Sequence, residues 1–252
     1  MQSEKVWTAA LVVIGDEILS GRTQDKNVAQ VATWLNEQGI RLAEVRIVPD
    51  DPQRIAETVN ALRGAHDYLF TTGGIGPTHD DITVDSIAAA LGVPVVVHPE
   101  ARRILEAYYR ERGGVTEARL RMARVPEGAE LIPNPTSGAP GVKIGNIYIL
   151  AGVPHIAASM LEALDGTLEG GRPMVSVTLG AFAAESDVAE MLREAEDRHP
   201  GVSVGSYPFM GQGRYGANFV IRCEDEALAR RAADEVAQEL QAAGYDPVEG
   251  GI

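Results

Sequence analysis

The chain of 252 residues contains a single cysteine, Cys223, and no long run of apolar residues. One cysteine excludes a disulfide within the chain and any metal cluster built on thiolates. Its neighbours Phe219, Val220 and Ile221 indicate a strand residue rather than a nucleophile. A helix that crosses a bilayer needs about 20 apolar residues, and the first residues lack the apolar core of a signal peptide. We therefore expect a cytoplasmic protein with no membrane partner.

Basic residues are also scarce. The chain has 22 Lys and Arg against 36 Asp and Glu, which gives a formal net charge of −14. This charge argues against nucleic acid as a partner, because the phosphate backbone repels an acidic protein. An anionic small molecule would have to be held locally, by backbone amides, a few cations or a metal ion.

The chain does contain a regular alternation of apolar strands and amphipathic helices. The run at 8–14 is almost wholly apolar, as expected of a strand buried on both faces of a parallel sheet. Asp51 before Pro52 predicts the start of a helix, and apolar runs at 40–48 and 68–70 predict two more strands. This β-α-β-α-β-α order predicts an α/β fold with a parallel, helix-covered sheet. Further strands are expected at 95–97, 142–144 and 147–150, helices at 99–112 and 154–164, and an irregular proline-rich stretch at 121–140.

A glycine-rich joint at 166–173 separates this pattern from a second one. Strands are expected at 174–179, 202–207 and 218–223, and helices at 187–197 and 225–243. This β-α-β-β-α order predicts a small α+β unit of a usual domain size. We therefore predict two domains, residues 1–170 and residues 171–252.

A glycine-rich loop follows the third strand and precedes a helix. Gly73, Gly74 and Gly76 have no Cβ atoms, so backbone N–H groups there can approach an anion closely. The loop has no Lys or Arg but carries Asp80 and Asp81, which would repel a phosphate unless a cation lay between them. A magnesium-type ion held by carboxylates and phosphate oxygens removes that conflict. The alternative is a tight turn in which Thr83 caps the following helix.

Several polar motifs lie just past the carboxyl ends of the predicted strands, where open α/β sheets bind their ligands. The acidic residues among them suit a hard metal ion and a general base, although not all of them can face one site. Asp85 is expected to be a bystander that favours the helix dipole, and His79 and His155 are expected to face solvent. The acidic residues of this edge are Asp16, Glu17, Asp50, Asp80, Asp81 and Asp85, and the best-placed cations are Arg22, Lys26 and Lys143.

Two motifs and their spacing resemble a known family. Residues 15–21 (Gly-Asp-Glu-Ile-Leu-Ser-Gly) with Asn27, and residues 72–83, look like the two hallmark motifs of the molybdopterin-binding MoaB/Mog fold. They are most similar to the version in the CinA (competence/damage-inducible protein A) family, whose later motifs resemble residues 134–141 and 151–154. Residues 205–208 and 218–219 resemble the small domain that follows in CinA-like proteins and in the molybdopterin-binding half of eukaryotic FAD synthases. The resemblance implies a three-layer, mostly parallel MoaB/Mog-like domain followed by a small α+β domain.

The resemblance also implies an activity. In the MoaB/Mog family two aspartates serve pterin adenylylation or metal binding, and they correspond here to Asp81 and Asp50. CinA-like proteins and the FAD-synthase half imply a metal-dependent pyrophosphatase acting on ADP-ribose- or FAD-type dinucleotides. The alternative is binding of molybdopterin or its adenylylated form without turnover. Related folds form dimers or trimers, so we expect a homo-oligomer. CinA proteins usually continue into an amidase domain, and amidase activity is not implied by residues 1–252.

These arguments give one set of site residues. We predict Asp16, Asp50 and Asp81 as catalytic residues and as ligands of a divalent metal ion, Mg²⁺ or a transition metal. The residues predicted to bind the nucleotide or pterin ligand are Gly15, Glu17, Gly73, Gly74, Gly76, Pro77, Thr78, Asp80 and Gly152.

Overall fold

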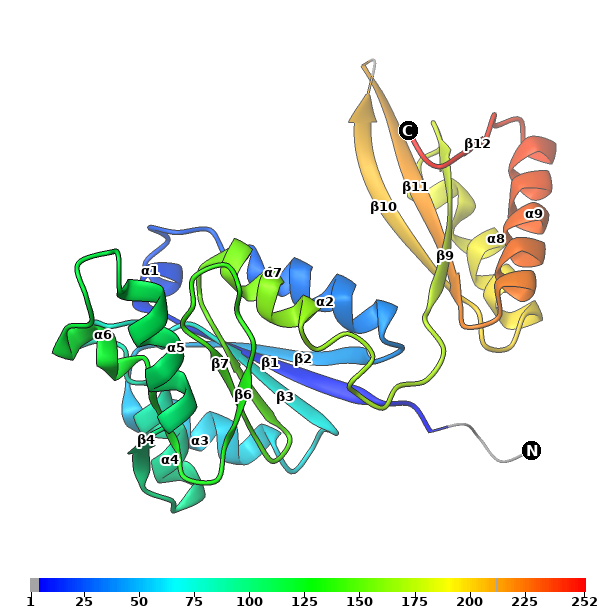
Figure 1. Cartoon of the computed structure of the whole chain (residues 1–252). Coiled ribbons are helices and arrows are strands. Elements are labelled where there is room, and N and C mark those ends of the chain that lie inside the picture. The colour runs from blue at the N-terminus through cyan, green and yellow to red at the C-terminus, as the bar shows by residue number, and fades with distance from the viewer. Residues whose placement is uncertain (1–4, 212) are drawn as a thin grey trace. The chain divides into compact units, whose positions relative to one another are not determined.

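A computed structural model describes residues 5–211 and 213–252 (Figure 1). The chain divides into two compact units: the first ends at Gly171 and the second comprises Arg172–Ile252. Each unit has its own apolar core. Within the described residues, no helix has the length and apolar character needed to cross a membrane.

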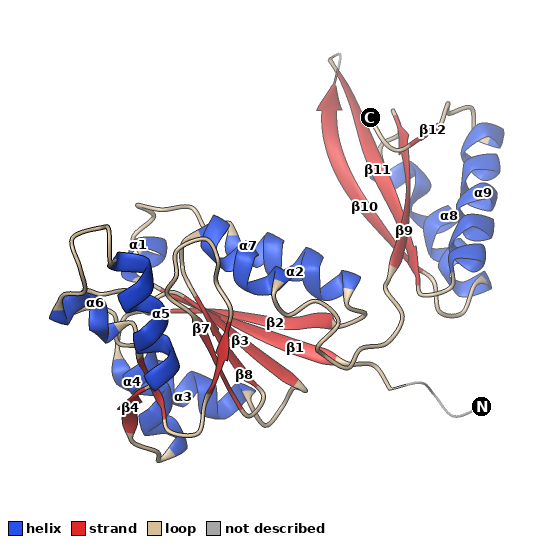
Figure 2. Cartoon of the chain, viewed as in Figure 1, coloured by secondary structure: helices blue, strands red, loops and turns tan. Residues whose placement is uncertain are grey.

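The first unit is built on a six-stranded sheet with the strand order β2-β1-β3-β8-β7-β6 (Figure 2). The strands β2, β1, β3 and β8 pair in parallel, and β7 and β6 extend the sheet in the antiparallel sense. Their bounds are β1 Thr8–Ile14, β2 Arg41–Val48, β3 Tyr68–Thr72, β6 Glu130–Ile132, β7 Gly141–Ile144 and β8 Ile147–Leu150. The mostly parallel sheet confirms the predicted fold class.

Helices cover both faces of this sheet, which gives three layers (Figure 2). Alternate residues of β1 show it: Leu11 belongs to a core with α2 and α7, whereas Val12 belongs to a core with α3 and α4. Both side chains are 0% exposed, so the apolar run of β1 is explained by burial on two sides. The helices are α1 Asp16–Leu19, α2 Asn27–Glu37, α3 Pro52–Leu62, α4 Thr83–Leu91, α5 Pro99–Tyr109, α6 Glu117–Arg121 and α7 Pro154–Glu162.

The stretch expected to be irregular, 121–140, is where the sequence prediction was wrong. It contains the strands β5 (Arg124–Pro126) and β6 (Glu130–Ile132), and α6 ends at its first residue. The strand β5 pairs with β4 (Val95–Val97) in a separate two-stranded sheet. Strands of three residues are too short to show an alternation of apolar and polar residues, so pairing with a distant partner decides their structure.

The second unit is an antiparallel sheet with the order β10-β11-β9-β12 and two helices. One core joins the sheet to the helices, with Phe219 among its largest fully buried side chains. The short strand β12 was not predicted. The element bounds are β9 Val175–Ala181, α8 Glu185–Arg198, β10 Ser203–Gly211, β11 Arg214–Cys223, α9 Glu226–Ala242 and β12 Val248–Glu249. Cys223 lies in β11 and is buried, as predicted for a strand residue.

Candidate functional site

The carboxyl ends of the parallel strands meet at one edge of the first unit's sheet. Backbone hydrogen bonds join the residues that follow these strands: the N–H of Gly15 donates to the carbonyl of Val48 at 3.1 Å, and the N–H of Gly73 donates to the carbonyl of Leu150 at 3.2 Å. The motifs after β1, β2, β3 and β8 are therefore held side by side, at the edge where open α/β sheets bind ligands.

The glycine loop begins with two positions at which only glycine fits. Gly73 has φ +101°, and a Cβ there would lie 2.1 Å from the carbonyl oxygen of Ile14. Gly74 has φ +65°, and its Cβ would lie 2.2 Å from Oγ1 of Thr83. Residues with a side chain rarely adopt positive φ, and a Cβ atom cannot lie this close to another atom. The loop thus lies directly against the end of β1. Gly152 also packs against it, since a Cβ at Gly152 would lie 3.1 Å from Cα of Gly73.

Thr83 holds this loop in place and does not cap α4. Its hydroxyl donates to the carbonyl of Gly73 at 2.8 Å, and its backbone N–H donates to the carbonyl of Gly74 at 3.0 Å. The N-cap of α4 is Ile82, which makes no side-chain cap bond. The capping alternative for Thr83 is therefore wrong, because its side chain is turned back toward the loop.

Replacing Thr83 with valine is expected to destabilise the protein by about 1–2 kcal/mol, because the buried carbonyl of Gly73 loses its side-chain donor. Thr71 offers a matched control: it is equally buried at 0% exposure, and its hydroxyl has no partner among the described residues. Thr71→Val should leave the free energy of unfolding unchanged or higher. Urea denaturation of both variants measures the difference, and equal losses would contradict the role given to Thr83.

An open, acidic pocket of about 410 Å³ lies beside the loop. It brings together six of the predicted site residues, from the motifs after β1, β2 and β3. The lining residues are Ile14, Gly15, Glu17, Arg22, Thr23, Asp50, Gly74, Asp80 and Asp81. Of the expected cations, Arg22 lines this pocket, whereas Lys143 forms an ion pair with Glu130 at 3.3 Å.

The pKa of Asp50 is shifted by its surroundings in this pocket. Its Oδ2 accepts a hydrogen bond from the backbone N–H of Asp16 at 2.9 Å. Burial raises the pKa of Asp50, and the charges of Asp16, Glu17 and Asp80 raise it further. The Asp16 hydrogen bond acts in the opposite direction but does not reverse the shift. A partly buried carboxylate beside other carboxylates is the setting in which a bound cation would lower the energy most.

Asp81 has a structural partner as well as a place in the pocket. Its Oδ2 accepts hydrogen bonds from the backbone N–H and the hydroxyl of Thr78, at 2.7 and 2.5 Å. Gly76 lies against the same carboxylate, since a Cβ there would meet Oδ2 at 2.7 Å. Asp81 therefore fixes the turn of the loop, and its role in catalysis or metal binding stays a prediction.

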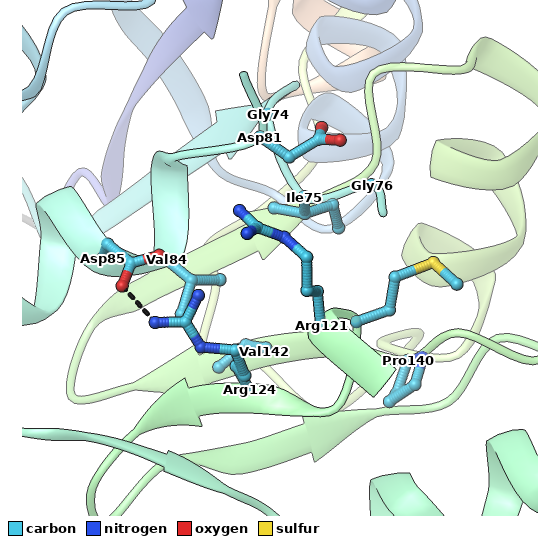
Figure 3. Close-up of a pocket in the computed structure, with 11 residues that line it drawn as sticks. Gly74, Ile75, Gly76, Asp81, Val84, Asp85, Arg121, Arg124, Pro140 and Val142 are labelled. Carbon is cyan, nitrogen blue, oxygen red and sulfur yellow. Dashed lines mark hydrogen bonds and ion pairs between the residues drawn. The ribbon is translucent and has the colours of Figure 1, made fainter. Parts of the chain in front are cut away.

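Two smaller hollows adjoin the acidic pocket. One, of about 60 Å³, shares Ile14, Glu17 and Thr23 with it and is also lined by Asn27, Thr72, Lys26 and Gly152. Oδ1 of Asn27 and Oγ1 of Thr72 are buried without a hydrogen-bond partner in the described part of the chain. The other, of about 20 Å³, shares Gly74 and Asp81 with the acidic pocket (Figure 3). Because each smaller hollow shares lining residues with the acidic pocket, we refer to the three hollows together as the row.

The remaining predicted residues lie around this row. Pro77 and Thr78 are exposed in the loop, and Gly76 lines the 20 Å³ hollow. Asp16 is not among the residues that line the acidic pocket, but its backbone N–H donates to Asp50, which does line it. Over residues 5–211 and 213–252, no three His, Cys, Asp or Glu side chains form a group that could hold a metal ion. The metal set Asp16, Asp50 and Asp81 stays a prediction.

Sequence reasoning missed two arginines of the row, Arg121 and Arg124. Arg121 ends a helix of five residues and Arg124 begins a strand of three, so neither lies in a segment with a recognisable period. Asp85, expected to be a bystander, forms an ion pair with Arg124 at 2.5 Å.

Both units match known protein families. Residues 10–169 match the family described as "Probable molybdopterin binding domain", and residues 173–249 match "FAD synthase, middle domain". The first match covers more than half of the chain, and together the two indicate a nucleotide- or molybdopterin-binding role.

Individual relatives agree with this assignment. A protein of Aeropyrum pernix is 36% identical over 244 residues, which cover 93% of this chain and 90% of that protein. A CinA-like protein of Citrifermentans bemidjiense is 37% identical over 196 residues, 74% of this chain and 47% of that protein. A crystal structure of the protein CinA from Thermoplasma acidophilum is 31% identical, with a TM-score of 0.59, and the match covers 64% of this chain and 98% of that one. The chain therefore belongs to the molybdopterin-binding-domain family as a CinA-like member.

Proposed function

We propose that the chain is a metal-dependent pyrophosphatase that hydrolyses a nucleotide pyrophosphate such as ADP-ribose or FAD. The observation that carries the proposal is the convergence of acidic side chains and glycine backbone on the 410 Å³ pocket. Glycine amides suit phosphate oxygens, and carboxylates suit a divalent cation that accompanies a phosphate. The matches to a molybdopterin-binding domain and to the middle domain of FAD synthase support a ligand that joins a phosphate to a flat heterocycle.

The pocket offers side chains of the type that a hard metal ion binds, although no three of them in the described residues form a complete set of ligands, so phosphate oxygens would have to supply the others. Glu17, Asp50 and Asp80 supply carboxylate oxygens, the ligands that Mg²⁺ and Mn²⁺ prefer. Burial raises the pKa of Asp50 first, and the charges of Asp16, Glu17 and Asp80 raise it further; a nearby divalent cation would favour the charged form. When bound, the ion would neutralise charge on the phosphates and bring them into an otherwise repulsive pocket.

The chain's own residues then have separate tasks. The backbone of Gly74 lies where it can donate to a phosphate oxygen, and Thr83 keeps that backbone fixed. Asp50 is the preferred base, since a carboxylate with a raised pKa accepts a proton from water more readily than an ordinary one. The water oxygen would attack one phosphorus, the bridging P–O bond would break, and ADP-ribose would yield AMP and ribose phosphate.

The second candidate is binding of molybdopterin, or its adenylylated form, without turnover. The match of residues 10–169 to a molybdopterin-binding domain favours it. The same glycine loop would receive the pterin phosphate. Turnover, rather than affinity, separates the two candidates.

The deciding experiment measures AMP release from ADP-ribose and from FAD by the full chain, with Mg²⁺ or Mn²⁺ and with EDTA. We expect release of AMP that depends on the divalent ion and stops when it is chelated. Catalytically inert protein that binds molybdopterin in calorimetry would instead support the second candidate.

A further inference from the structure

The 20 Å³ hollow is lined by an arginine, Arg121, whose Nε has no hydrogen-bond partner in the described part of the chain. Arg121 closes α6 and points into this hollow toward the glycine loop (Figure 3). Its Nε is buried and makes no hydrogen bond within the described residues. The residue as a whole is half-buried, but a buried N–H group without an acceptor is unfavourable. The arrangement therefore leaves Arg121 prepared for an acceptor that is not part of the described chain.

Both acidic side chains of the hollow are already engaged. Asp85 forms its ion pair with Arg124, and Asp81 accepts two hydrogen bonds from Thr78. Figure 3 shows the Asp85–Arg124 pair beside an Arg121 that has no drawn interaction. Arg121 is thus a positive charge that these acids do not neutralise, in a chain with a formal net charge of −14.

The size of the hollow limits what can enter. A volume of about 20 Å³ accommodates one water-sized group. One oxygen atom of a phosphate fits this space, whereas a purine, flavin or pterin ring does not. Gly74 and Asp81 line both this hollow and the acidic pocket, so the two hollows adjoin at these residues.

We propose that Arg121 binds the second phosphoryl group of the ligand and so selects pyrophosphates over monophosphates. This inference rests on the proposed function, because it places one phosphoryl group over the acidic pocket with the metal ion. The other phosphoryl group extends past Gly74 and gives an oxygen to Arg121. A guanidinium in this position recognises phosphate through charge-assisted hydrogen bonds. A ligand with a single phosphate reaches only one of the two positions.

The test compares two probes by calorimetry in the presence of Mg²⁺: α,β-methylene-ADP, which has two phosphoryl groups and resists hydrolysis, and AMP, which has one. We expect Arg121→Gln to weaken binding of α,β-methylene-ADP by about tenfold or more, and binding of AMP by less than about threefold. Arg121→Lys keeps the positive charge but lacks the planar guanidinium group, so it should bind α,β-methylene-ADP more tightly than Arg121→Gln and less tightly than the wild type. Arg110→Gln is the control, because Arg110 is exposed at the end of α5 and loses the same charge.

The outcomes separate this inference from the proposed function. Equal affinities of wild type and Arg121→Gln for α,β-methylene-ADP would overturn the role of Arg121, as would an equal loss for both probes or no binding of either probe by the wild type. Selective loss of α,β-methylene-ADP binding in a protein that releases no AMP from ADP-ribose would support Arg121 and overturn the hydrolase. A Tm of Arg121→Gln close to that of Arg110→Gln shows that the variant is folded.

Discussion

Asp50→Asn is expected to lower AMP release from ADP-ribose by about a hundredfold or more, because it removes the preferred base and one carboxylate of the proposed metal site. Asparagine retains an oxygen that can accept the hydrogen bond from the N–H of Asp16. The local backbone should therefore remain as it is. Steady-state kinetics at saturating Mg²⁺ measure the loss.

The adjacent Asp51 provides a matched control for this variant. Asp51 is the N-cap of α3 and accepts the backbone N–H of Arg54 at 2.8 Å. Asparagine is an equally good N-cap, so Asp51→Asn changes the net charge by the same amount at the neighbouring position without losing the cap. It should retain wild-type activity. Equal activities of the two variants would remove Asp50 from the mechanism.

The same Asp50 variant should be at least as stable as the wild type near neutral pH. The pKa of Asp50 is raised in the folded state above its ordinary value of 3.8. The folded protein therefore binds this proton more tightly than the unfolded chain, and Asp50 opposes folding once the pH exceeds both pKa values. The stability advantage of Asp50→Asn should be full at pH 7. It should shrink as the pH falls through the folded pKa, which urea denaturation at a series of pH values measures; an advantage that grows toward acid pH would contradict the sign.

Gly73→Ala is expected to cost roughly 3 kcal/mol or more of unfolding free energy, through two separate effects. Positive φ disfavours alanine by about 1–2 kcal/mol, and overpacking adds about 1–3 kcal/mol. The overpacking arises because the new Cβ would lie 2.1 Å from the carbonyl oxygen of Ile14. This oxygen belongs to the backbone of a buried central strand, so it cannot rotate away as a side chain would.

Gly92→Ala separates the two effects. Gly92 has φ +70° and nothing within 4 Å of its Cβ position, so alanine there should cost only about 1–2 kcal/mol, the cost of the positive φ. Urea denaturation of both variants gives the difference. Similar losses of unfolding free energy in the two variants would show that the backbone at the end of β1 can move to accommodate the new Cβ. The close contact between the glycine loop and β1 would then not be rigid.

The fold and the edge that carries the site could be predicted because the information is local. Apolar runs mark the parallel strands, and the geometry of a parallel sheet brings their carboxyl ends together. Gly15, Glu17, Asp50, Gly74, Asp80 and Asp81 were found in this way, and the structure lines one pocket with them. The aspartates were recognised by their position after a strand.

Arg121 could not be found by the same reasoning. It reaches the site because β5 pairs with the distant β4, and because α6, only five residues long, precedes that strand. The spacing of apolar residues along the sequence gives no sign of pairing between distant strands. The hydroxyl of Thr83 was misassigned for a related reason: a threonine before a helical pattern predicts a cap, and only the three-dimensional path of the loop shows that its acceptor is Gly73.

The shared walls of the hollows affect how the proposed reaction would end. Gly74 and Asp81 line both the acidic pocket and the hollow of Arg121, so under the proposed function an intact pyrophosphate would hold both positions through one covalent link. That link would give each phosphoryl group a high effective concentration at its own subsite. Cleavage of the bridging bond would remove the link, and each product would then be retained by a single subsite. The two products would leave independently, so the reaction itself would lower the affinity that held the substrate.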